Sequence, residues 1–226
     1  SLLKKNDVTE EHIGCIVIGN PGVVNPESGE MRLNADFAVW HNLPIRNLFI
    51  DAFEKPVLVY NDVNLSAIGE KIYGVGKGYE NFIYIRDDVG LKAGIVINGT
   101  LFEGEHHAAG EFGLNYLIGN ASPASSLLNF QRVESKVSIQ ALIKEVQQKM
   151  PENPNDALWA LSGNNPKAVT VDVIRKALDT TDTFIHKIIE TYTQLLAISI
   201  ANLTLTLDIG LIVFGGEIIQ LNDYIL

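Results

Sequence analysis

The stretch Val57-Leu-Val-Tyr-Asn-Asp-Val-Asn-Leu-Ser-Ala-Ile68 decides the fold class of this chain. Its first four residues form an apolar run, typical of a short buried strand, and an apolar face including Leu65, Ile68 and Ile72 predicts a helix directly after it. Strands are also expected at 13–18, 82–85, 93–97 and 211–214, and helices at 44–53, 137–149, 155–162, 169–178 and 182–207. Strands followed by helices in this order indicate an α/β architecture.

Length, charge and cysteine content limit what the chain can be. The 226 residues suffice for one large domain or two small ones with a sizeable core. A net charge of −10 argues against direct binding of nucleic acid or an acidic membrane. The single cysteine, Cys15, lies in an apolar run, so we expect a buried thiol and no internal disulfide, consistent with a cytoplasmic protein. The apolar stretch Leu195–Leu207 is too short to span a bilayer and is expected to be a buried helix.

Asn61 and Asp62 stand where the quoted strand ends and its helix begins. Ligands of open α/β sheets bind outside the carboxyl ends of the strands. A carboxylate at such a place can act as general base on a hydroxyl group, and the neighbouring amide can hold that hydroxyl. The alternative is that Asp62 is only the N-cap of the helix, and on these two residues alone the cap is the favoured interpretation.

Residues 83–94, Ile-Tyr-Ile-Arg-Asp-Asp-Val-Gly-Leu-Lys-Ala-Gly, have the outline of a strand, a phosphate-cradling turn and a second strand. Such a cradle needs small residues whose backbone N–H groups close on an anion. Asp87 and Asp88 are instead expected to place two negative charges at the mouth of the turn, where they would repel a nucleotide. The alternative is a solvated acidic turn. Asn98-Gly99, a little further on, is a strong hairpin signal.

The segment Gly104-Glu-His-His-Ala-Ala-Gly-Glu-Phe-Gly113 adds a carboxylate, Glu111, between two glycines. Together with Val59–Glu70, Asn20-Pro21-Gly22-Val23, Gly74–Gly78 and Ile97-Asn-Gly99, all in the same order, it resembles the repressor–ORF–kinase (ROK) family. This family comprises sugar kinases and sugar-responsive transcription regulators. The resemblance covers most of the chain and points to regulators of the xylose-repressor or N-acetylglucosamine-repressor type.

The resemblance implies an actin-like ATPase, ribonuclease-H-like two-lobed fold that binds sugar and ATP in its cleft. Residues 1–60 would then belong to the first lobe and 61–226 to the second, in a fragment that lacks the amino-terminal strands and the carboxyl-terminal helices. A DNA-binding domain would lie upstream of this chain, and the family suggests a homodimer. The positions that match the family's sugar contacts are Gly22, Asn61, Asp62, Glu111 and Glu134. Asp62 would also be the catalytic base if the protein is a kinase.

The chain departs from the family pattern at two sites. The family's zinc ligands, one histidine and three cysteines, fall here on Leu114 and near Ser125, Leu127 and Arg132, none of which suits zinc. The adjacent His106 and His107 cannot rebuild the site alone. The family's phosphate loop falls on 87–94, where two glycines have become Asp88 and Lys92 and a threonine has become Val89, while Gly90 is kept. We therefore expect no zinc and no ATP as cofactor.

Three functions fit these observations. The first is a sugar-sensing effector domain of a ROK-type repressor, which binds a monosaccharide or sugar phosphate without phosphorylating it. The second is an ATP-dependent, glucokinase-like hexose kinase. The third is a dimerisation scaffold that binds no ligand. The altered phosphate loop favours the sensor over the kinase, and the retained Asn61, Asp62 and Glu111 favour it over the scaffold, because a scaffold needs no converging polar groups.

Overall fold

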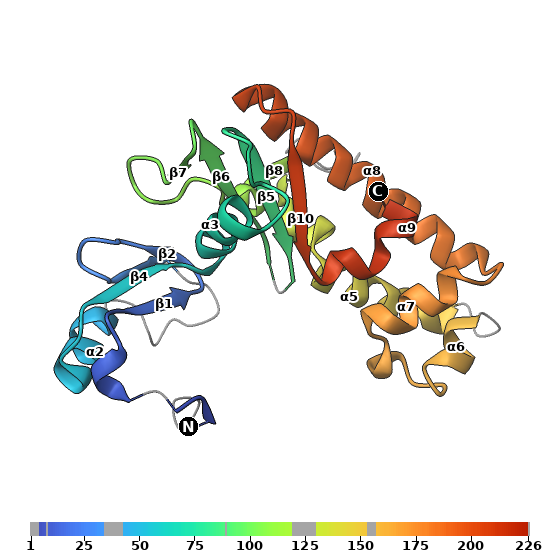
Figure 1. Ribbon diagram of the computed structural model, residues 1–226. Coiled ribbons are helices and arrows are strands. Elements are labelled where there is room, and N and C mark those ends of the chain that lie inside the picture. Colours follow the sequence, from blue (N-terminus) through green and yellow to red (C-terminus); the bar gives the residue numbers. More distant parts are fainter. Residues whose placement is uncertain are drawn as a thin grey trace. The chain divides into compact units, whose positions relative to one another are not determined.

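The structure is a computed structural model, and it describes residues 5–7, 9–33, 43–88, 90–118, 130–152 and 157–225. Strands and helices alternate in the first half, and helices predominate in the second (Figure 1). The chain divides into two compact units. Unit 1 comprises Ser1–Tyr79 and Gly94–Ala109, and unit 2 comprises Glu80–Ala93 and Gly110–Leu226. The division into lobes at residue 60 stays a prediction.

The described strands are β1 (Ile16–Asn20), β2 (Val23–Val24), β3 (Met31–Leu33), β4 (Val57–Asn61), β5 (Phe82–Asp87), β6 (Leu91–Ile97), β7 (Thr100–Phe102), β8 (Tyr116–Ile118), β9 (Phe130–Arg132) and β10 (Ile212–Gly216). The described α-helices are α2 (Ile45–Phe53), α3 (Asp62–Tyr73), α4 (Glu134–Val137), α5 (Ile139–Lys149), α6 (Ala157–Leu161), α7 (Val171–Leu178), α8 (Thr183–Leu207) and α9 (Asn222–Ile225). Two of the short 3₁₀-helices bear on the site, namely η3 (Phe112–Leu114) and η6 (Glu217–Leu221).

Unit 1 is built around the parallel pair β1 and β4, whose register runs from Ile16 opposite Val57 to Asn20 opposite Asn61. Its core gathers apolar residues from β2, β3, β4 and α2. Helices α2 and α3 both contact β4. Because parallel strands end at the same edge of a sheet, the side chains that follow β1 and β4 are brought together there.

The larger sheet has the order β10-β5-β6-β7. Strand β10 is parallel to β5, with Ile212 opposite Ile83. The first four residues of β5 are all buried. The hairpin predicted at Asn98-Gly99 is confirmed: β6 and β7 are antiparallel, and both turn residues have positive φ, 51° and 75°. Strand β5 is thus a central strand, and its carboxyl end carries Asp87.

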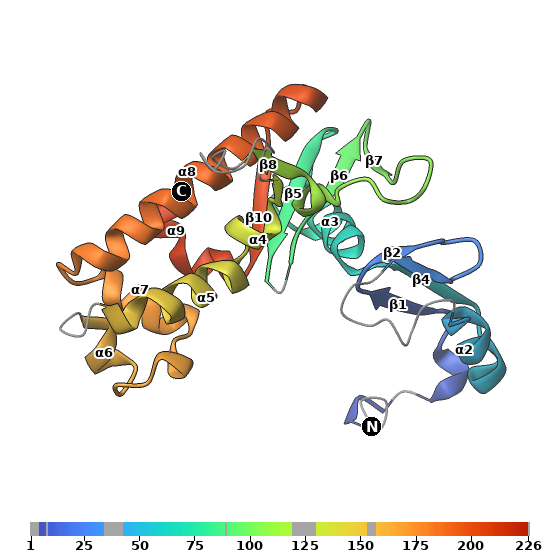
Figure 2. The same cartoon turned by 180° about the vertical axis from the view of Figure 1, so that it is seen from behind.

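The helical part of unit 2 packs around the long helix α8, which α4, α5 and α7 contact (Figure 1). The same arrangement is visible from behind in Figure 2. Asp182 caps α8 by accepting hydrogen bonds from two main-chain N–H groups of its first turn. The buried residues of the helix, which form one face, are Ile185, Ile188, Ile189, Tyr192, Leu196 and Ser199.

Two expectations about burial are wrong. Cys15 is exposed: it directly precedes β1, where exposed positions alternate with partly buried ones, and Val17, two residues further on, is 52% exposed. The stretch from Leu195 to Leu207 is not a buried helix, because Ser199 is the last buried residue of α8 and Leu205 is 81% exposed. Within the described ranges, α8 is the one helix that is long and apolar enough, by length and composition, to cross a membrane.

Candidate functional site

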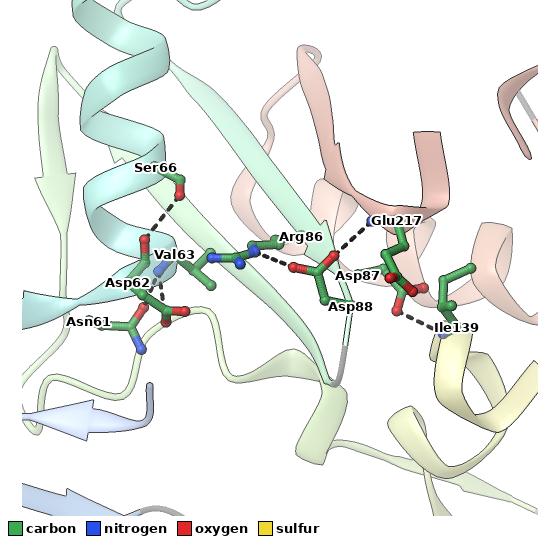
Figure 3. Close-up of polar contacts among 9 residues, drawn as sticks. All are labelled: Asn61, Asp62, Val63, Ser66, Arg86, Asp87, Asp88, Ile139 and Glu217. Carbon is green, nitrogen blue, oxygen red and sulfur yellow. Dashed lines mark hydrogen bonds and ion pairs between the residues drawn. The ribbon is translucent and has the colours of Figure 1, made fainter. Parts of the chain in front are cut away.

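Asn61 connects the end of β4 to the start of α3 (Figure 3). Its side-chain oxygen accepts hydrogen bonds from the N–H groups of Val63 (2.9 Å) and Asn64 (3.1 Å), so Asn61 is the N-cap of the helix. Its side-chain nitrogen donates to the carbonyl of Gly22 at 2.8 Å. The interpretation of Asp62 as the cap is therefore wrong. Asp62 is the first residue inside the helix.

Asp62 is half-buried, and its carboxylate lies at the amino-terminal end of α3. Its Oδ1 accepts from the Val63 N–H at 3.0 Å, while its main-chain carbonyl accepts from the Ser66 hydroxyl at 3.0 Å (Figure 3). The positive end of the helix dipole stabilises a carboxylate at this position. Because the cap is supplied by Asn61, the Asp62 carboxylate is not required to start the helix. It is a suitable acceptor, or general base, for a hydroxyl group.

Asn20, the register partner of Asn61, was not predicted to be a site residue. It is 2% exposed, and its side-chain nitrogen has no hydrogen-bond partner in the described part of the chain. A buried donor without a partner typically costs about 1–3 kcal/mol. The signal was present in the sequence, because Asn20 is a polar residue at the end of an apolar strand.

Glu111 belongs to unit 2, in a loop that lies directly against β6. The N–H of Ala93 donates to the carbonyl of Gly110 at 2.8 Å. A Cβ atom at Gly110, where φ is +87°, would lie 1.9 Å from the Ala93 carbonyl oxygen, and one at Gly113 would lie 2.3 Å from that of Leu91. Only glycine permits this close approach. The two glycines therefore fix the backbone on either side of Glu111.

Lys92 lies on β6 between the two residues that hold this loop. Its Nζ is 3.4 Å from Oε1 of Glu111, and the two side chains are only 23% and 16% exposed. The resemblance to the family places Lys92 at a glycine position of the phosphate loop. In the structure it forms an ion pair with Glu111.

Glu134, the first residue of α4, lies close to the Glu111 loop. Its Cβ is 3.2 Å from the position that a Cβ of Gly113 would take, and its Oε2 is 3.7 Å from the corresponding position at Gly90. Its Oε1 is 3.8 Å from Nη1 of Arg132, in a partly exposed ion pair. Unit 2 thus brings together two of the carboxylates that the sequence proposed as sugar contacts. Unit 1 brings together Gly22, Asn61 and Asp62.

Asp87 is not at the mouth of a turn, and this expectation is wrong. Its side chain is fully buried at the end of β5, where Oδ1 accepts from the N–H of Ile139 at 2.8 Å and Oδ2 accepts from the Tyr192 hydroxyl at 2.6 Å (Figure 3 shows the first contact). Burial raises the pKa of Asp87 to about 7, although the hydrogen bonds from Tyr192 and Ile139 act in the opposite direction. The neighbouring carboxylates of Asp88 and Glu217 raise it further. Asp87 therefore joins β5 to the start of α5 and to α8.

Asp88 carries a charge that is already paired, so the expected charge repulsion is weaker than the sequence indicated. Its Oδ2 is 2.5 Å from Nε of Arg86, and its Oδ1 accepts from the main-chain N–H of Glu217 at 2.7 Å (Figure 3). Gly216, just before Glu217, has a φ of +87°, and a Cβ there would lie 2.5 Å from the same Oδ1. The Asp88 carboxylate thus accepts a hydrogen bond from the main-chain N–H that directly follows β10.

Four partners in these contacts were missed by the sequence reasoning, namely Arg86, Ile139, Tyr192 and Glu217. Tyr192 is 105 residues from Asp87 and Glu217 is 129 residues from Asp88, so no local pattern could pair them. Val89, Ser125 and Leu127, which belong to the expected phosphate loop and lost zinc site, lie outside the described residues. The described residues contain no group of three or more His, Cys, Asp or Glu side chains that could hold a metal ion. The absence of zinc stays a prediction.

Comparison with known proteins decides the family. The family model described as "ROK family" matches residues 1–225. This chain belongs to the ROK family. Its α/β architecture is the actin-like ATPase fold of that family, as the sequence predicted.

Both regulators and kinases are among its relatives. The chain is 28% identical over 215 residues to a xylose repressor from Caldicellulosiruptor bescii, covering 95% of this chain and 53% of that protein. It is 26% identical over 211 residues to a glucokinase from Halalkalibacterium halodurans, covering 93% of this chain and 63% of that protein. The chain therefore spans less than two thirds of the length of these relatives.

A solved structure shows the same fold. A ROK family transcriptional regulator, a homologue of the E. coli MLC protein, superimposes with a TM-score of 0.81 at 24% identity, over 99% of this chain and 55% of the other.

Proposed function

We propose that this chain is the sugar-sensing effector domain of a ROK-family transcriptional regulator, which binds a monosaccharide without phosphorylating it. The proposal combines two features of the molecule. The positions that match the family's sugar contacts keep side chains suited to hydroxyl groups. The positions that match its phosphate loop are occupied by an internal network of hydrogen bonds and ion pairs.

The observation that carries the proposal is the position of Asp88. Its carboxylate accepts from the Glu217 N–H at 2.7 Å and pairs with Arg86 at 2.5 Å. A nucleotide phosphate would need backbone donors and cations of this kind. Here an internal carboxylate uses them, and an incoming polyphosphate would have to displace it against charge repulsion.

The sugar side supports binding by its chemistry. A sugar hydroxyl both donates and accepts hydrogen bonds, so carboxylates and amides can each pair with it. Asp62 and Glu111 are half-buried carboxylates on rigid supports, a capped helix in one case and a glycine-fixed loop in the other. Asn61 precedes Asp62 in the sequence, and its side-chain nitrogen donates to the carbonyl of Gly22. Glu134 lies beside the Glu111 loop.

An ATP-dependent sugar kinase is the second candidate. Asp62 at the start of α3 is the position that matches the family's catalytic base, and a glucokinase is among the relatives. The half-buried Asp62 carboxylate is equally compatible with hydroxyl activation and with hydroxyl binding. The two functions differ in whether ATP is consumed.

The other parts of the proposal concern the whole protein. We propose that DNA is bound by a domain outside this chain, that the protein is a cytoplasmic homodimer, and that it needs neither zinc nor ATP. The xylose repressor relatives support the first point, because this chain spans only part of their length. The net charge of −10 also argues against DNA binding by these residues themselves.

The test is calorimetry of the full-length protein against a panel of hexoses, pentoses and their phosphates, without ATP. We expect one monosaccharide or sugar phosphate to bind, and Asp62→Ala and Glu111→Ala to weaken it by about ten- to a hundredfold, because hydrogen bonds to charged groups contribute about 1.5–3 kcal/mol. Glu190→Ala, on the exposed side of α8, is the matched control. If no sugar binds, or if both substitutions leave binding unchanged, the scaffold becomes the better interpretation.

A further inference from the structure

Strand β6 holds the Glu111 loop at three successive residues. Leu91 approaches Gly113 and Ala93 bonds to Gly110, both through the main chain. Lys92, between them, reaches the Glu111 side chain with its ammonium group, 3.4 Å from Oε1. The main-chain contacts fix where the Glu111 backbone lies, and the Lys92 contact acts on its carboxylate.

We propose that Lys92 is a positioning residue, which holds the Glu111 carboxylate in the orientation that accepts a sugar hydroxyl. This inference rests on the proposed function, because it assigns Glu111 to the sugar. Lys92 pairs through Oε1, and a carboxylate offers about four acceptor directions on its two oxygens. Oε2 therefore keeps its capacity to accept from a ligand while Oε1 is held.

The surroundings of the pair explain why it matters energetically. Both side chains are mostly buried, so their attraction is screened less by water than that of a surface pair. A glutamate without such a partner would sample several rotamers, and fixing it on ligand binding would cost affinity. The ion pair fixes the side chain before the ligand arrives.

Lys92 stands at a position where the family pattern has glycine. The positive charge of its ammonium group also balances the negative charge of the Glu111 carboxylate. The inference therefore gives lysine, in place of the family's glycine at position 92, a role in sugar binding.

Calorimetry of the full-length protein against the same panel of hexoses, pentoses and their phosphates tests the inference. For the ligand that wild type binds, we expect Lys92→Met to weaken binding by about three- to tenfold, the loss that corresponds to ordering one long side chain on binding. Lys92→Arg, which keeps the charge, should restore most of the affinity. Lys144→Met, on the exposed face of α5, removes the same charge elsewhere and should have no effect.

Two further measurements separate positioning from a general effect on folding. In a Glu111→Gln background, Lys92→Met should not weaken binding further, because its effect acts through the Glu111 carboxylate. The difference between wild type and Lys92→Met should also largely persist as salt rises from about 0.01 M to about 1 M, because a mostly buried pair is screened much less by salt than a surface pair.

The outcomes distinguish the inference from the function on which it rests. Sugar binding by wild type that Lys92→Met leaves unchanged, or that Lys92→Arg does not restore, would overturn the role of Lys92 and leave the proposed function intact. No binding of any sugar by wild type would overturn both. In that case, the unfolding free energies of Lys92→Met, Glu111→Gln and the double variant would still show whether the ion pair itself is formed.

Discussion

Asp87 and Asp88 are adjacent in the sequence, yet their carboxylates have different surroundings. Asp87 is fully buried and hydrogen-bonded to the start of α5 and to Tyr192. Asp88 is partly exposed and paired with Arg86. Asp87 therefore connects β5 with α5 and α8. Asp88 accepts a hydrogen bond from the main-chain N–H of Glu217, the residue after Gly216.

The buried carboxylate predicts a pH dependence of stability. The folded pKa of Asp87 is about 7, above the ordinary value of 3.8, so the folded state binds a proton that the unfolded state has lost. The contribution of Asp87 is then fully present below about pH 4 and is lost as pH rises through about 7, at about 1.4 kcal/mol per pH unit between these values. Chemical unfolding of the full-length protein at pH 5.5 to about 8 measures this fall in stability.

Asp87→Asn is the variant that isolates the effect. An asparagine side chain can still accept from the Ile139 N–H, and its amino group can donate to the Tyr192 hydroxyl oxygen, but it does not titrate. We expect the variant to lose the downward slope and to exceed wild type in stability at pH 8. Equal slopes for the two proteins would show that Asp87 is ionised in the folded state across this range.

At the scale of single elements, the start of helix α3 gives two adjacent residues, Asn61 and Asp62, different contacts. Asn61 satisfies two main-chain donors of the first turn and the Gly22 carbonyl. Asp62 lies within the first turn and accepts from one N–H group. The cap is thus available without Asp62.

We therefore predict different effects on stability for the two alanine variants. Asn61→Ala should lower the unfolding free energy by about 2 kcal/mol, from the lost cap and the lost bond to Gly22. Asp62→Ala should cost less than about 1 kcal/mol, the value of an acidic residue near a helix start, while weakening sugar binding. Urea unfolding and calorimetry on the full-length protein measure both quantities. A loss of stability in Asp62→Ala as large as that in Asn61→Ala would contradict this division of roles.

The elements themselves were largely predictable from sequence, because helix periodicity and turn residues are local signals. Residues 182–207 predicted α8 to within one residue at its start, and Asn98-Gly99 predicted the β6–β7 hairpin. The burial of Asp87 was not predictable, because Ile139 and Tyr192 lie 52 and 105 residues away. The apolar run around Cys15 likewise did not show that this residue shares the exposed side of β1 with Val17.

At the scale of the whole molecule, the family membership and the lost ligand residues predict a protein without structural zinc. Leu114 and Arg132 stand at two of the four ligand positions of the family, and neither side chain binds zinc. Metal analysis of full-length protein purified without added zinc should give far less than one equivalent. A stoichiometric zinc that resists chelators would show that the ligands come from other residues.

The last prediction is that the full-length protein does not hydrolyse ATP in response to sugar, and that Asp88 is one reason. Its carboxylate takes the Glu217 N–H and lies against Arg86, where a phosphate would meet its charge. At an effective dielectric of about 20, two unit charges about 4 Å apart interact by about 4 kcal/mol, before the Arg86 pairing reduces this figure.

Asp88→Gly, which restores the family's glycine, should therefore bind MgATP at least about tenfold more tightly than wild type. Asp208→Gly removes the same charge from the left-handed C-cap of α8, where glycine is well accepted, and should leave ATP binding at the wild-type level. Robust sugar phosphorylation by wild type in a coupled assay would instead identify the protein as a kinase, with Asp62 as its base.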